Sequence, residues 1–248
     1  MRLRRVGQPS SVGPRGRGVT REGMVTLCDD VIGNWPLSPR AGGKIPFMGE
    51  TRTAESAGHP VHWPVPPHNG YTVDDLFTLP DLPPHTEMID GILVFVSPQR
   101  YFRVAVIDLL VSGLRRTLPS DMRVAREMTV VLDKHNGPEP DICVVRGKAL
   151  TDRRQTRFEA ADVLLAVEVV SPDSESRDRD TKPRKYAAAG IPNFWLVDMA
   201  GEDDHPVVQV YELGKVTGTY ALTGVYRDHV KITVPYGIDI DLTEIDAL

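Results

Sequence analysis

The sequence predicts an α/β fold built on one mixed β-sheet, and three patterns carry that prediction. The run 163–170 holds one charge among seven apolar residues, which is typical of a strand buried on both faces. Residues 107–118 repeat apolar side chains at i, i+3 and i+4, as in an amphipathic helix. From residue 207 onward, apolar and polar residues alternate, which favours antiparallel strands ending the sheet.

The chain divides near residue 70. Residues 1–69 contain ten glycines and nine prolines without a sustained hydrophobic period, so they bury too little apolar surface to offset the entropy of ordering. We therefore expect a disordered tail over 1–69 and one domain over 70–248. The first 23 residues carry six arginines and one acid, which indicates a weak nucleic-acid arm or, preferably, a start codon assigned too early; Met24 and Met48 are alternative starts.

Cap and turn residues define the first elements of the domain. Thr72 is the expected N-cap of a short helix with two aspartates in its first turn. Residues 87–97 are expected to form a hairpin around the turn Asp90-Gly91. The amphipathic helix over 107–118 follows, and its apolar stripe is expected to face the sheet.

The remaining elements are strands with one more helix among them. Alternation over 122–132 predicts a half-buried strand, interrupted at Arg126, and a second strand runs over 141–145. After the buried strand 163–170 we expect a polar loop, a helix over 183–189 and a strand over 194–197. Further strands are expected in the alternating tail at 207–213, 219–222, 230–234 and 238–242.

Glu168 is the one charge inside the run 163–170. An ionised carboxylate in a buried strand costs several kcal/mol unless something compensates it. A bound metal ion is one compensation, and proteins keep such groups mainly where chemistry needs them. The alternatives are a structural ion pair, or a position at the exposed end of the strand.

A second carboxylate, Asp141, opens the neighbouring predicted strand. Two carboxylates on adjacent strands repel each other unless a cation lies between them, and magnesium, with its preference for hard oxygen ligands, suits that place. The segment 177–185 supplies Arg and Lys side chains, most of them expected to be solvated. Carboxylates beside a lysine indicate metal-assisted phosphodiester hydrolysis, in which the lysine stabilises negative charge or helps to deprotonate water.

Composition argues against several other classes. The net charge of −5 divides into +4 for residues 1–69 and −9 for 70–248, whereas strong DNA-binding domains are usually basic. The seven histidines form no ligand spacing and the two cysteines lie far apart, so we expect neither zinc nor a disulfide. No phosphate-cradling glycine loop, membrane span or secretory signal is expected, which predicts a cytoplasmic protein without a nucleotide cofactor.

Together, these segments resemble a known family. Pro140-Asp141, the segment Glu168-Val-Val-Ser-Pro172, then Lys182, Tyr186 and the strand 194–198 are similar, in order and spacing, to the Uma-two family. Its members are restriction-endonuclease-like proteins of the PD-(D/E)XK nuclease superfamily. The resemblance covers about residues 70–235, includes the hairpin at 87–94, and implies a restriction-endonuclease-like mixed sheet flanked by helices.

The resemblance also implies roles for individual residues. Asp141 matches the aspartate of the PD motif and Glu168 the acid of the (D/E)XK motif, both metal ligands in the superfamily. Val169 would offer its backbone carbonyl to the metal, and Glu87 matches an acid that helps to bind metal or water. The expected ion is magnesium, with manganese as an alternative.

The lysine of the motif departs from the superfamily pattern. Its usual place, two residues after the acid, holds Val170, and the resemblance implies a lysine moved to the following helix, where Lys182 matches it. A long flexible side chain tolerates such a change of anchor. Pro183 is expected in the first turn of that helix, which would leave Lys182 extended, so Lys185 is the alternative.

These observations predict a magnesium-dependent endonuclease acting on DNA, with Glu87, Asp141, Glu168 and Lys182 as its catalytic residues and a homodimer as its expected assembly. Two alternatives stay open. The domain could be an inactive nuclease fold that serves as an interaction or regulatory module, which the acidic charge favours. It could also hydrolyse RNA or another phosphoester, because a metal cluster reads the phosphodiester and not the sugar.

Overall fold

The structure, a computed structural model, describes residues 65–200 and 204–248. The predicted tail therefore lies outside the described residues except for 65–69, as do Cys28 and both alternative start sites. Across the part of the chain that is described, every helix is too short or too polar to span a bilayer.

A six-stranded mixed sheet forms the centre of the domain, as the sequence predicts. Its strands follow the order β10-β9-β8-β7-β5-β3, and only the pair β7 and β8 is parallel. In sequence order these strands are β3 (Met122–Arg126), β5 (Ile142–Arg146), β7 (Val163–Val169), β8 (Asn193–Ala200), β9 (His205–Leu213) and β10 (Tyr220–Tyr226). The buried run therefore occupies an interior strand, β7, where both faces are covered.

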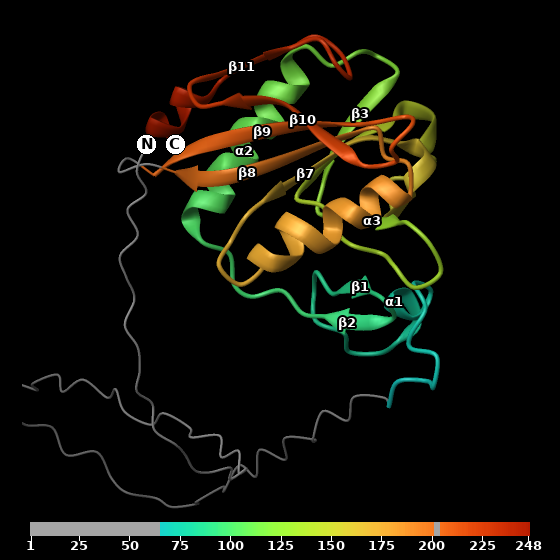
Figure 1. Cartoon of the computed structure of the whole chain (residues 1–248). Helices are drawn as coiled ribbons and strands as arrows, with labels where there is room; N and C mark the ends of the chain where they lie inside the picture. Colours follow the sequence, from blue (N-terminus) through green and yellow to red (C-terminus); the bar gives the residue numbers. More distant parts are fainter. Residues whose placement is uncertain (1–64, 201–203) are drawn as a thin grey trace, which may run out of the picture. The chain divides into compact units, whose positions relative to one another are not determined.

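Two helices cover opposite faces of this sheet (Figure 1). Helix α2 (Tyr101–Arg116) packs its stripe of Val106, Leu110 and Leu114 on one face, together with the C-terminal hairpin β11 (His229–Ile232) and β12 (Ile238–Asp241). Helix α3 (Lys182–Ala188) packs on the other face through Tyr186 and Ala187. Both faces of β7 are thereby dry, which gives the desolvation expected for Glu168.

Short elements complete the domain. The expected hairpin is present as β1 (Glu87–Ile89) and β2 (Ile92–Val94), turning at Asp90 and Gly91, which both have positive φ (52° and 72°). The short helix is α1 (Asp75–Thr78), and its N-cap is Asp74, not Thr72 as expected. The Thr72 hydroxyl instead donates to the Asp75 carboxylate at 2.9 Å. The 3₁₀ turns are η1 (Gly147–Ala149), η2 (Ala160–Asp162) and η4 (Leu242–Ala247).

Three expectations about the strands are corrected. Residues 122–132 form two strands, because Glu127 takes a left-handed conformation (φ 48°) and ends β3. The second, β4 (Thr129–Val131), leaves the main sheet and pairs in parallel with β6 (Arg157–Glu159), a strand that sequence reasoning did not predict. The last two tail strands, β11 and β12, pair with each other and not with the main sheet.

The expected polar loop before α3 is partly helical. Residues 177–181 form a π-helical turn, η3 (Arg177–Thr181), which runs directly into α3. Lys182 is helical, with φ −63° and ψ −46°, so the expectation of an extended residue before Pro183 is wrong. A π turn adds a residue to the helix, and the wider turn accommodates a proline that lacks an N–H and would crowd the preceding carbonyls.

Candidate active site

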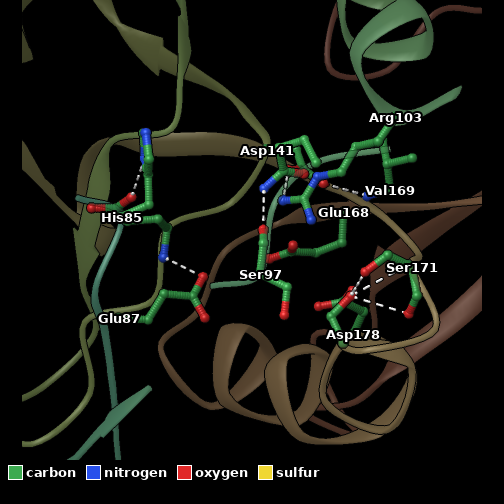
Figure 2. Close-up of polar contacts among 12 residues, drawn as sticks. His85, Glu87, Ser97, Arg103, Asp141, Glu168, Val169, Ser171 and Asp178 are labelled. Carbon is green, nitrogen blue, oxygen red and sulfur yellow. Dashed lines mark hydrogen bonds and ion pairs between the residues drawn. The ribbon is translucent and has the colours of Figure 1, made fainter. Parts of the chain in front are cut away.

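Four buried carboxylates gather beside the first turn of α3. Figure 2 shows Glu87, Asp141, Glu168 and Asp178 reaching one region from the hairpin, from the approach to β5, from β7 and from the helical turn η3. Their exposed fractions lie between 0% and 4%. Because so many acids are rarely buried without compensation, their partners decide what the site can do.

Lys182 is the central cation of this cluster. Its Nζ lies 2.8 Å from Glu87 Oε1, 3.1 Å from Glu168 Oε2 and 3.4 Å from Asp178 Oδ1. Burial lowers the pKa of this ammonium, but the attraction of Glu168, Glu87 and Asp178 outweighs burial and raises it well above its usual value. Lys182 is therefore a cation held in one position by three acids.

The predicted alternative, Lys185, lies elsewhere. Its Nζ contacts Asp90 Oδ1 at 2.5 Å, at the turn of the β1–β2 hairpin. On a helix, positions three residues apart point in directions about 60° apart, and only Lys182 meets the buried acids. The helical conformation of Lys182 is what aims its side chain inward.

Glu168 has two partners, one on each carboxylate oxygen. Lys182 donates to Oε2, and the Tyr186 hydroxyl, one helical turn further along α3, donates to Oε1 at 2.6 Å. Burial raises the pKa of Glu168 well above its usual value, and Asp178, Asp141 and Glu87 raise it further, while Lys182 lowers it. Burial likewise keeps the Tyr186 phenol protonated by raising its pKa, so this hydroxyl remains a donor.

Asp141 is satisfied by different groups. The backbone N–H of Val169 donates to its Oδ2 at 2.6 Å, and the guanidinium of Arg103, from the first turn of α2, donates to Oδ1. Burial raises the pKa of Asp141 to about 6, although Arg103 and the Val169 N–H oppose that rise. The backbone N–H of Val169 thus holds the Asp141 carboxylate in place.

The hairpin side of the site continues to the surface. Glu87 accepts the backbone N–H of Glu139 at 3.0 Å, and the Glu139 carboxylate lies 3.2 Å from Nδ1 of the exposed His85. Burial raises the pKa of Glu139 above its usual value. The rigid approach Pro138-Glu139-Pro140 therefore positions both Glu87 and Asp141.

Sequence reasoning missed Arg103 and the His85–Glu139 pair. The ion pair of Asp178 with Lys182 and the hydrogen bond of Tyr186 to Glu168 complete the cluster. A signal for Arg103 was available, since it lies four residues before Ile107 and seven before Leu110, on the apolar stripe of α2. A charge on a buried stripe is the same signal that singled out Glu168 in its strand.

The cluster has more acid than base. Four carboxylates face two cations, Arg103 and Lys182, and Oδ1 of Asp178 is buried without a hydrogen bond. Carboxylate oxygens with an excess of negative charge are the donor chemistry that hard divalent cations prefer. In the described residues, no three His, Cys, Asp or Glu side chains stand together as a ready metal cage.

Comparisons with known proteins agree with the fold and with the family resemblance. A crystal structure titled as "a putative nuclease belonging to DUF820", from Anabaena variabilis ATCC 29413, superposes with a TM-score of 0.56 at 18% identity and covers 71% of this chain and 97% of its own. No curated protein matches the chain. The family model Uma2, described as "Putative restriction endonuclease", matches residues 73–244. The chain therefore belongs to the Uma2 family, the Uma-two family of the sequence resemblance, and it shares the fold of the Anabaena protein.

Proposed function

We propose that this protein is a magnesium-dependent endonuclease that hydrolyses DNA phosphodiester bonds. One observation carries the proposal: a buried lysine ammonium lies between Glu87 and Glu168, within 3.1 Å of both. The description of the Uma2 family as restriction endonucleases supports it. Purely structural ion pairs of this size are seldom favoured over apolar packing, so a chemical role explains why the cluster is retained.

The donor set fits a hard divalent cation. Asp141 and Glu168 would hold it, with the Val169 carbonyl as the predicted third ligand, and the excess of acid over base supplies the attraction. Bound there, magnesium would polarise the phosphate and lower the pKa of a bound water. Manganese, which accepts the same oxygen ligands, is the expected substitute.

The protein's own residues position and neutralise charge. Lys182 is a fixed cation, so we assign it electrostatic stabilisation of the negative charge that develops on the phosphate. Tyr186 orients Glu168 through its hydroxyl, and the Val169 N–H orients Asp141. Asp178 adds a third acid to Lys182 and limits the directions in which its ammonium can point.

An interaction module without catalysis is the second candidate, and Arg103 is the observation that favours it. Its guanidinium already neutralises the Asp141 carboxylate that the metal would need. In a protein that bound no metal, Arg103 and Lys182 would be permanent structural partners of the acids. Metal binding distinguishes the two functions, because the nuclease requires it and the interaction module does not.

The test is the nicking of supercoiled plasmid by the full chain with magnesium, manganese or EDTA. Asp141→Asn keeps the shape of the side chain and removes its charge, and Asp239→Asn, at an exposed carboxylate on β12, is the matched control. Nicking that needs metal, persists in the control and is lost in Asp141→Asn is the expected result. Absence of nicking and of calorimetric metal binding would overturn the proposal in favour of the interaction module.

A second cleavage assay distinguishes DNA from RNA as the substrate. Labelled RNA and DNA of one sequence are incubated with equal amounts of enzyme, because the metal site itself does not recognise the sugar. Cleavage of DNA alone supports the proposal. Cleavage of RNA alone would keep the metal-dependent hydrolysis and replace the substrate.

A further inference from the structure

A cavity lies beside α3, away from the acidic cluster. The cavity, of about 450 Å³, opens between α3 and strands β8 to β10, and the aromatic residues Phe194, Tyr211 and Tyr220 line it. Its volume falls within the range of small-molecule pockets, roughly 300–1,000 Å³. None of the residues of the acidic cluster lines this cavity.

The aromatic lining is an ordered stack. The Phe194 and Tyr220 rings are stacked with centroids 5.5 Å apart, and Tyr211 tilts against Phe194 at 5.8 Å. Phe194 is buried and forms the inner wall, while Tyr211 and Tyr220 are half-buried and reach the opening. The Tyr220 hydroxyl donates to the Ile191 carbonyl and the Tyr211 hydroxyl to Gln209, which fixes both rings. Rigid aromatic faces of this kind are platforms for planar ligands.

Two arginines stand at the rim of the cavity. Arg179 forms a two-pronged contact with Asp198, at 2.6 and 3.0 Å, and is fixed by it. Arg184 forms an exposed ion pair with Asp180, one turn earlier on the helix. Exposed pairs contribute little, so Arg184 can exchange its aspartate for an incoming anion. The rim thus places Arg184, paired with the lining residue Asp180, next to an aromatic interior.

The cavity and the proposed catalytic site are separate, but both adjoin the strand pair β7–β8. Leu196, which lines the cavity, is the register partner of Glu168 in the parallel pair β7–β8. Helix α3 separates the two places: Lys182 and Tyr186 face the acids, whereas Pro183 and Ala187 face the cavity. A linear polymer bound across α3 could therefore place one of its units in the cavity and another near the acids.

We propose that this cavity binds one unpaired base of a nucleic-acid strand, stacked on the aromatic residues with its phosphate on Arg184. The substrate of the proposed nuclease is then a single strand, or a duplex with a base turned out of the stack. Base stacking on aromatic side chains beside a cationic groove is the general chemistry of single-strand recognition. The identity of the strand as substrate rests on the proposed function, whereas the binding itself does not.

Binding is measured with the full chain in EDTA, so that no hydrolysis is needed. Fluorescence anisotropy compares one labelled oligonucleotide as a single strand and as a blunt duplex. Ala188→Trp fills the opening from an exposed position of α3, and Arg184→Glu reverses the charge of the rim. Arg154→Glu is the matched control, because Arg154 is also exposed and paired with one aspartate but lies away from the cavity.

The wild type is expected to bind the single strand at least tenfold more tightly than the duplex. Either cavity variant should lower the single-strand affinity about tenfold. The control should bind the single strand within twofold of the wild type. Equal affinity for duplex and single strand, unchanged binding by Ala188→Trp, or no binding at all would overturn the proposal. A nucleoside monophosphate that binds as tightly as the strand would assign the cavity to free nucleotides and also overturn it.

The two proposals fail separately. Cavity-dependent binding together with no metal-dependent nicking would retain the base site and reject the nuclease. Nicking that Asp141→Asn abolishes, together with strand binding that the cavity variants leave intact, would retain the nuclease and reject the base site.

Discussion

The ammonium of Lys182 and the carboxylate of Glu87 lie 2.8 Å apart although 95 residues separate them in the chain. Neither residue belongs to the strand pair that holds Glu168 and Asp141, so the contact joins the hairpin and the helix across the end of the sheet. Both side chains are almost fully buried, at 4% and 5% exposure. The contact makes Lys182 the residue whose replacement should be most informative.

Replacing Lys182 by Met should abolish the proposed nicking, with a loss of at least about 100-fold, because the charge that stabilises the phosphate is removed. Lys185→Met should retain activity, since that lysine contacts only the hairpin turn. Plasmid nicking measures both, and thermal unfolding checks that the variants fold. Retained nicking by Lys182→Met, with activity lost in Lys185→Met, would show that the helix supplies the other lysine.

Glu168→Gln should separate metal binding from stability. Amide replacement preserves shape, keeps an acceptor for Tyr186 and removes one of four crowded carboxylates, so the melting temperature in EDTA should hold or rise. Magnesium should stabilise the wild type and leave this variant unchanged, because a ligand that binds the folded state shifts unfolding by mass action. Equal stabilisation of both proteins by magnesium would contradict a metal site at Glu168.

Arg103→Gln should lower stability and tighten metal binding. The guanidinium is the buried partner of Asp141, and removing one partner of such a pair costs about 3–5 kcal/mol. The same guanidinium competes with a metal for the Asp141 carboxylate, so calorimetric affinity for magnesium should rise. Arg116→Gln, at an exposed pair with Glu244, is the control and should change neither quantity. Weaker magnesium binding by Arg103→Gln would mean that Arg103 helps to build the metal site.

Cys143 should be inert toward alkylation in the folded protein. Burial raises the pKa of its thiol to about 12, although the Ala125 backbone opposes the rise, so the neutral thiol prevails at pH 8 and becomes reactive only on unfolding. The raised pKa means that thiolate forms in the folded state only as pH rises towards that value. Iodoacetamide labelling of a Cys28→Ser variant, with and without urea, measures this. Rapid labelling at pH 8 without urea would place Cys143 at the surface.

The elements that the sequence predicted correctly are those whose burial is visible in composition. Strand β7 and helix α2 each carry a long apolar pattern, and the Asp90-Gly91 turn has residues that adopt positive φ. The break between β3 and β4 depends on Glu127 at φ 48°, a conformation that a glutamate rarely adopts and that nothing in the local sequence signals.

The sequence predicted the acidic residues of the candidate site better than its cationic residues. Glu168 and Asp141 stand out because charges on or beside buried strands are rare. The helical state of Lys182 was mispredicted, since the rule for residues before proline gave way to the π turn at 177–181. Arg103 carried a local signal as a charge on the apolar stripe of α2, but its partner, Asp141, is distant in sequence and only the fold brings the two together.

The long-range contact of Lys182 also bears on how the protein is made. Glu87 precedes Lys182 by 95 residues, and Lys182 follows β7 in the chain. The acidic cluster is therefore complete only after most of the chain has been synthesised and α3 has docked. Contacts of such large sequence separation form only after their loop entropy has been overcome, so they tend to form late in folding. A nascent chain that ends before α3 contains the acids but not their lysine. The acids therefore lack their buried cation until α3 has docked.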